Sequence, residues 1–152
     1  MTLENTLRPH LNDSLPGGFH VDAKGWSIGI VAEKKDSLSC ALNELTLEKA
    51  GPIPEELRAW ATRIAEDATG LLEPLALLEV DGAVGKALLR SETPTHKDGR
   101  TLYYELLLTR GERTLASLRR YAAANGERRE SIPFVLTNDA IVKLVEDIVG
   151  KN

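Results

Sequence analysis

Short runs in which apolar and polar residues alternate recur along most of the chain, and turn signals separate them. Such runs are typical of strands that bury one face, and short turns between them favour antiparallel pairing. The runs lie at residues 19–21, 26–30, 38–47, 75–80, 84–90, 101–109, 113–124 and 131–136. Helical patterns interrupt them, and we therefore expect an α+β protein in the order α-βββ-α-ββββ(β)-α, an antiparallel sheet with helices on one side.

Three amphipathic segments are predicted to be helices. The first carries a leucine at every fourth position, and the second spans residues 54–69, where Pro54 suits the first helical position and Gly70 can end the helix. The third follows Thr137 or Asn138, either of which can cap it. The expected buried stripes are Leu3, Leu7, Leu11 and Leu15 in the first helix, Leu57, Trp60, Ile64 and Ala68 in the second, and Ile141, Leu144, Val145 and Ile148 in the third.

Residues 113–124 fit two structures. Their Ala, Leu and Arg content favours a helix, and Leu115, Leu118 and Ala122 could share a helical face. Against this, Asn125-Gly126 is the dipeptide most typical of a two-residue hairpin turn, and the residues beyond it look extended. We predict two strands joined at this turn.

Length and composition limit the class of protein. The chain has 152 residues, 42% of them apolar and 28% charged, with a formal charge of −4. These values predict a single globular domain over residues 1–152 and are too mild to imply a nucleic-acid or membrane partner. The lone Cys40 cannot form an internal disulfide, and the opening residues carry an early glutamate unlike a signal peptide, so we expect a cytoplasmic protein.

Residues that often carry catalysis are scattered. His10, His20 and His96 show no metal-ligand spacing, and Cys40 sits in an alternating run that favours a buried small side chain. The sequence contains neither a serine-hydrolase elbow nor a glycine-rich phosphate loop. We therefore expect no enzyme, no metal and no cofactor.

Positive charge is concentrated late in the chain. Residues 100–129 contain seven arginines against three glutamates, a formal +4. Arginine suits bidentate contacts to carboxylate or phosphate, so a small anion- or nucleic-acid-binding module is the alternative hypothesis. No nucleic-acid motif accompanies these residues, and we prefer a solvated strand surface. The candidate anion-binding residues are Arg110, Arg113, Arg119, Arg120, Arg128 and Arg129.

The second helix offers a candidate protein interface. Trp60 is a large amphipathic side chain on a helix that follows a proline-rich turn, and tryptophan is enriched at protein interfaces. Leu57 and Ile64 share its face. Because symmetric dimers are the commonest oligomers, we expect this face to form a homodimer contact.

Three segments resemble the type III secretion chaperones. An amphipathic helix ends near Leu15 and is followed by residues 19–28, which are similar to that family's strand, acidic turn with glycine, and strand. Residues 50–57 are similar to its Gly and Pro entry into the middle helix, and residues 138–149 to its closing helix. The chain departs from the family in extra strand material over residues 101–135. The resemblance implies a noncatalytic cytoplasmic dimer, a chaperone or adaptor that presents an apolar surface to a segment of another protein.

Overall fold

Backbone hydrogen bonds between antiparallel strands join all the strands of the described residues into one open sheet. The computed structural model describes residues 2–12 and 17–150, and these residues form three helices and ten strands. The helices are α1 (Leu3–Asn12), α2 (Leu57–Asp67) and α3 (Asn138–Val149). The strands are β1 (Gly17–Ala23), β2 (Trp26–Lys35), β3 (Ser39–Ala50), β4 (Leu75–Asp81), β5 (Lys86–Ser91), β6 (Thr95–Lys97), β7 (Arg100–Thr109), β8 (Arg113–Ala123), β9 (Glu130–Ile132) and β10 (Phe134–Thr137).

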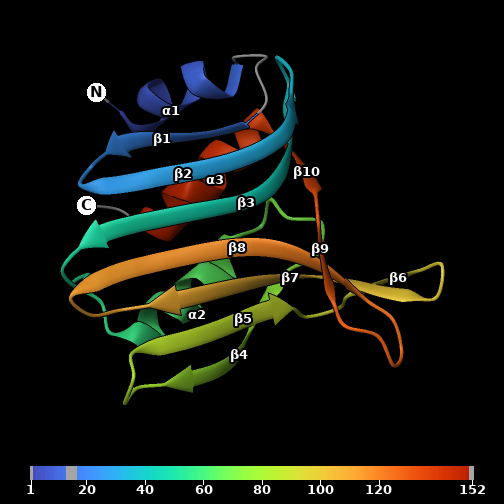
Figure 1. Cartoon of the computed structure of the whole chain (residues 1–152). Helices are drawn as coiled ribbons and strands as arrows, with labels where there is room; N and C mark the ends of the chain where they lie inside the picture. The colour runs from blue at the N-terminus through green and yellow to red at the C-terminus, as the bar shows by residue number, and fades with distance from the viewer. Residues whose placement is uncertain (1, 13–16, 151–152) are drawn as a thin grey trace.

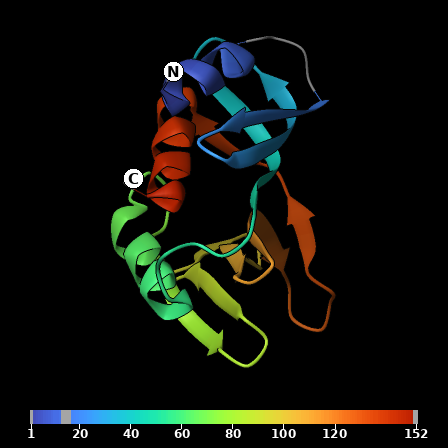
Figure 2. The ribbon, with the colours of Figure 1, turned by 90° about the vertical axis from the view of Figure 1, so that its left-hand side faces the viewer.

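The sheet brings the two halves of the chain side by side. Its path is β1-β2-β3-β8-β7-β5-β4, and β10, β9 and β6 are added to β3, β8 and β7. As Figures 1 and 2 show, α2 and α3 lie on one face of the sheet, and α1 packs against α3 and β1. The α+β prediction is therefore confirmed. No helix in the described part of the chain is long and apolar enough to cross a membrane.

The strand prediction for residues 113–124 is confirmed, because β8 lies in the middle of the sheet between β3 and β7. Alternate β8 side chains are buried, and packing on both neighbouring strands outweighs the helical propensity of the segment. The predicted two-residue turn is wrong. Ala122 pairs with Glu130, so residues 124–129 form a longer loop.

Two further boundaries differ from the prediction. The strand expected over residues 131–136 is divided at Pro133, which has no backbone N–H to donate, and its halves pair with different strands. Between the runs expected at 84–90 and 101–109, the structure adds the short strand β6, in which Thr95 pairs with Leu102.

Helix α2 is shorter than predicted at both ends. It begins at Leu57 rather than at Pro54, because Glu56 directly before it is extended. The carbonyl of buried Ile53 accepts a hydrogen bond from Arg110 Nη2 at 2.9 Å. It ends at Asp67, and the Ala68 N–H donates to the Ile64 carbonyl at 2.8 Å. The predicted buried stripe of Leu57, Trp60, Ile64 and Ala68 is confirmed.

The other two helices bury the stripes that their periodicity predicts. In α1 the buried residues include Leu3, Leu7 and Leu11, whereas Leu15 lies outside the described residues. In α3 the predicted face is buried, and the Thr137 hydroxyl caps the helix by accepting from the Ala140 N–H at 3.1 Å.

The last carbonyl groups of α2 and of α3 each accept hydrogen bonds from side chains of the other helix. Trp60 Nε1 of α2 donates to the Ile148 carbonyl at 3.0 Å, and Arg63 donates to the same carbonyl at 3.2 Å and to that of Asp147. In return, Lys143 of α3 donates to the Asp67 carbonyl at 2.8 Å. Because the last carbonyls of a helix have no partner within it, these bonds fix the two helix ends together.

Asn138 ties three segments together at the other end of α3. Its side chain, in a residue 2% exposed, donates to Asn12 Oδ1 at 3.1 Å and to the Ser37 carbonyl at 3.3 Å. The Cys40 thiol donates to Asn138 Oδ1 at 3.3 Å. The end of α1, the β2–β3 turn and the start of α3 therefore meet at one buried amide.

We expect Asn138→Ala to lower the free energy of unfolding by about 1–3 kcal/mol, because it leaves buried polar groups without partners. Urea unfolding measures the change. Asn43→Ala is the matched control, since Asn43 donates only to exposed Glu33, and it should change stability by less than about 0.5 kcal/mol. Equal losses in the two variants would contradict the role given to Asn138.

Candidate functional site

One face of the sheet carries no helix within residues 2–12 and 17–150. Figure 1 views this face, with α2 and α3 behind the strands. We call it the open face. Side chains that point away from the helices, such as Leu88 and Leu107, lie on it, while their neighbours Leu89 and Leu106 are buried on the helix side. The open face is therefore the largest part of the sheet available to a partner.

Three leucines from three neighbouring strands form a row on the open face. Leu88 of β5 and Leu107 of β7 are direct partners in the sheet register. Leu88 also pairs with Glu79 of β4, and a bulge places Leu78 beside Glu79 as an extra residue. Leu78 is 57% exposed and Leu107 is 48% exposed, whereas Leu88 is partly buried between them. We call Leu78, Leu88 and Leu107 the leucine row.

A ladder of ion pairs lies next to the leucine row. Arg90 of β5 lies two residues after Leu88, and its partner Glu105 of β7 lies two residues before Leu107. Arg90 pairs with Glu105 at 2.9 Å, and Arg129 binds the same carboxylate at 2.7 Å. Farther along, Arg119 of β8 pairs with Glu44 of β3 at 2.6 Å. Burial alone would raise the pKa of Glu105, but hydrogen bonds from Arg129 and Arg90 hold that pKa below its ordinary value.

The six arginines singled out from the sequence do not gather into one positive surface. Arg119 and Arg129 belong to the ladder, Arg113 pairs with Glu48, and Arg120 pairs with Glu73. Arg110 donates to a backbone carbonyl, and its Nε is buried without a partner. Of these six arginines, Arg128 alone makes no ion pair or hydrogen bond through its guanidinium to a described residue. Strand register places glutamates opposite the arginines, so the charge excess in the sequence is largely cancelled in space.

The Arg120–Glu73 pair is buried on the helix side of the sheet. Its two parallel hydrogen bonds measure 3.0 and 2.7 Å. The hydroxyls of Ser91 and Thr95 donate to the same carboxylate at 2.7 and 2.6 Å, and the Arg120 guanidinium lies 4.3 Å from the centre of the Tyr104 ring. Burial would raise the pKa of Glu73, but these donors lower it. Each carboxylate oxygen of Glu73 accepts two hydrogen bonds from within the chain. The pair is therefore structural and leaves no acceptor for a ligand.

The face of α2 proposed as a dimer contact is not on the surface. Trp60 and Ile64 are fully buried and Leu57 is buried, all within the core of this one chain. Trp60 packs against Trp26, with ring centres 6.3 Å apart. The stripe was correctly predicted as apolar, but the sheet and α3 cover it. A partner would have to contact another surface.

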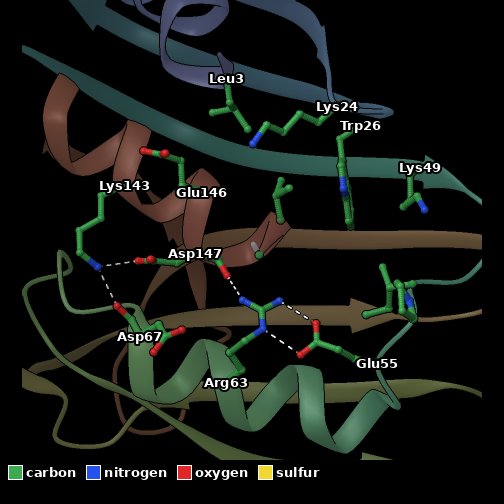
Figure 3. Close-up of a pocket in the computed structure, with 14 residues that line it drawn as sticks. Leu3, Lys24, Trp26, Lys49, Glu55, Arg63, Asp67, Lys143, Glu146 and Asp147 are labelled. Carbon is green, nitrogen blue, oxygen red and sulfur yellow. Dashed lines mark hydrogen bonds and ion pairs between the residues drawn. The ribbon is translucent and has the colours of Figure 1, made fainter. Parts of the chain in front are cut away.

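A cleft opens on the helix side of the sheet, the face that does not carry the leucine row. It has a volume of about 820 Å³ and lies between the β1–β2 hairpin, α2 and the end of α3 (Figure 3). Trp26, Ile53 and Val149 contribute apolar surface to it. Leu3, Pro54 and Gly150 also line it, and the remaining lining residues are charged: Lys24, Lys49, Glu55, Arg63, Asp67, Lys143, Glu146 and Asp147.

Two of the four cations in the cleft are engaged within the chain. Arg63 binds both oxygens of Glu55 at 2.9 Å, and Lys143 binds Asp147 at 2.7 Å. For Lys24 and Lys49, no carboxylate of the described residues lies within ion-pair distance. Sequence patterns did not reveal this site, because its residues come from six separate segments of the chain.

Comparison of the chain with protein-family models, with curated proteins and with solved structures finds no match. No group of three or more His, Cys, Asp or Glu side chains suited to a metal ion occurs in the described ranges 2–12 and 17–150. The case for a function therefore depends on the leucine row and the cleft.

We expect Glu73→Gln to lower the free energy of unfolding by about 3–5 kcal/mol, because it leaves the buried Arg120 charge uncompensated. The double variant Glu73→Leu, Arg120→Met should recover most of that loss, since it removes both charges. Chemical denaturation of the three proteins gives the comparison. Glu79→Gln, at an exposed position of β4, is the control. If Glu73→Gln were as stable as the double variant, this account would be contradicted.

The free energy of unfolding should also decrease as the pH becomes acid. The pKa values of Glu73 and Glu105 are lower in the folded chain than ordinary glutamate values, so the unfolded chain takes up protons first as pH falls. The stabilisation is fully present above about pH 5 and is lost progressively below it. Urea unfolding between pH 7 and 3 tests this, and Glu105→Gln should flatten part of the acid loss. A stability that is constant over this range would show that the pKa values are not lowered.

Proposed function

We propose that this chain is a noncatalytic protein-binding module of the chaperone or adaptor type, which presents the leucine row to a segment of another protein. The observation that carries the proposal is the register of Leu78, Leu88 and Leu107 on the open face. Single exposed leucines are ordinary on protein surfaces, but three on adjacent strands form a continuous apolar contact.

The surroundings of the leucine row suit a protein partner. Ion pairs made within the chain, such as Arg90–Glu105, flank the row on one side, and the exposed Glu79, the register partner of Leu88, adds a carboxylate to its rim. An apolar centre with a polar rim is the usual anatomy of a protein interface. The exposed edge strand β4 is protected from strand addition by its bulge and by Glu79 and Asp81, so contact through the face is favoured over contact through this edge.

Spacing favours a helical partner segment. Neighbouring strands lie about 4.8 Å apart, so the row repeats at about this distance. An amphipathic helix presents one apolar side chain per turn, about every 5 Å along its axis, whereas an extended strand presents one about every 7 Å. A helix that crosses the strands therefore matches the row best, with apolar residues at positions i, i+3 or i+4, and i+7.

The noncatalytic cytoplasmic role and the homodimer do not depend on the leucine row. The noncatalytic, cytoplasmic role agrees with the resemblance in layout to type III secretion chaperones. A homodimer remains a proposal, and it would need a surface other than the buried face of Leu57, Trp60 and Ile64. The anion-binding alternative gains no support, because most of the arginines that suggested it bind carboxylates of the same chain.

We expect peptides selected from a displayed library of 15-residue sequences to carry the helical i, i+3 or i+4, i+7 apolar pattern. Their affinity should fall at least about tenfold for the double variant Leu78→Ser, Leu107→Ser, which removes two apolar contacts. Val135→Ser is the control, because Val135 is even more exposed, at 68%, but lies on β10. Fluorescence anisotropy measures the affinities.

Other results would contradict the proposal in distinct ways. Selected peptides that bind the double variant as tightly as the wild type would place the binding site elsewhere. Light scattering after size-exclusion chromatography adds a second readout. A wild-type dimer that becomes a monomer in the double variant would show that a second copy of the chain occupies the leucine row.

A further inference from the structure

We infer that the segment held by the leucine row is an acidic amphipathic helix, whose carboxylates bind Arg90 and Arg119 of the ion-pair ladder beside the row. This inference rests on the proposed function and names the chemistry of the partner. Three properties of the ladder select such a partner: which of its groups face outward, how they are held, and how far apart they lie.

The ladder presents guanidinium groups on its outside and keeps its carboxylates beneath them. The arginine side chains are 42% exposed in Arg90, 44% in Arg119 and 40% in Arg129. The carboxylates that bind them are covered more deeply, at 5% exposed for Glu105 and 24% for Glu44. Three cations also stand against two carboxylates. A partner that lies on the row therefore meets positive charge along this flank.

Both arginines that the inference names keep hydrogen-bond donors free. Arg90 binds Glu105 through Nε alone, at 2.9 Å, and neither of its Nη groups donates to a described residue. Its guanidinium lies 5.3 Å from the centre of the Tyr103 ring, which supports it. Arg119 uses Nε and Nη2 on one oxygen of Glu44 and leaves Nη1 without a described acceptor. The ladder therefore fixes two planar forks, and such forks suit the geometry of a carboxylate.

The spacing of these two arginines matches a helix that crosses the strands. Figure 1 shows β5, β7 and β8 side by side. Arg90 of β5 pairs with Glu105 of β7, and Glu105 pairs with Arg119 of β8, so the arginines lie two strand spacings apart, about 9.6 Å. Residues seven apart on a helix are separated by about 10.5 Å along its axis and lie on nearly the same side. A helix that follows the leucine row can therefore place two carboxylates over these arginines.

The ladder also lies at a suitable distance to one side of the row. Arg90 follows Leu88 by two residues on β5, and Glu105 precedes Leu107 by two residues on β7. Two residues cover about 7 Å along a strand, and a helix with its side chains has a radius of about 5–6 Å. Side chains on the flank of a helix centred on the row therefore reach the outer edge of the ladder.

Charge is balanced on the opposite flank of the row and in the cleft. Lys86 on that flank is the register partner of Asp81, one cation against one carboxylate. Glu79 lies at the β4 end of the row rather than on the ladder flank. Four cations and four carboxylates line the cleft. Charge complementarity therefore acts along the ladder flank, where it selects an acidic partner.

The test uses three synthetic 15-residue helical peptides that share one apolar stripe with the i, i+4, i+7 pattern. Two positions seven residues apart on one flank carry Glu, Gln or Lys. We expect the Glu peptide to bind about three- to tenfold more tightly than the Gln peptide, and the Lys peptide to bind least tightly, because each exposed ion pair contributes a modest attraction. Fluorescence anisotropy measures the affinities, and the preference for Glu should shrink as the salt concentration rises.

The double variant Arg90→Gln, Arg119→Gln should bind the Glu and Gln peptides with about equal affinity, because both outward cations are gone. Arg113→Gln is the matched control. Arg113 is an exposed arginine that pairs with Glu48 outside the ladder, so its loss should leave the preference for Glu unchanged. Circular dichroism shows whether each variant is folded.

The outcomes separate this inference from the proposed function. Equal affinity of the wild type for the Glu and Gln peptides would overturn the inference alone, provided that both peptides bind more weakly to Leu78→Ser, Leu107→Ser. A preference for Glu that persists in the double arginine variant would also overturn it, since the carboxylates would then bind elsewhere. Undiminished binding by the leucine variant, or no binding of any of the three peptides, would contradict the proposed function and this inference with it.

Discussion

The central position of β8 is the constraint on which the rest of the structure depends. It pairs with β3 on one side and β7 on the other, and so joins the first three strands to the later ones in a single sheet. Its alternate side chains serve different faces: Leu118 and Arg120 are inside, and Arg119 is on the open face. A helix at this place would leave two sheets with unpaired inner edges, which explains why pairing outweighs the local helical preference.

The same register decides where charge remains. Glu44 and Glu48 of β3 pair with Arg119 and Arg113, and these two carboxylates from outside the segment offset half of the formal +4 of residues 100–129. The buried Arg120–Glu73 pair removes another arginine from the surface. The leucine row offers apolar area, and Lys24 and Lys49 offer cations that no described carboxylate neutralises.

The helix layer has a structural role first and forms the cleft as a consequence. Trp60, Arg63 and Lys143 use their polar groups to close the ends of α2 and α3, and the aromatic part of Trp60 supports Trp26 from behind. A tryptophan that the sequence suggested for an interface is therefore part of the core, one layer behind the cleft.

Local periodicity alone determined the α+β class, the three helices and which face of each helix is buried, because side-chain repeats of two or 3.6 residues are set by the backbone itself. It also favoured a strand at residues 113–124, through the turn signal that follows. Only the tertiary structure decided the pairing of arginines with glutamates, the burial of Trp60, and the division of the last strand at Pro133. Each of these depends on register between segments far apart in the chain, and sequence spacing carries no information about that register.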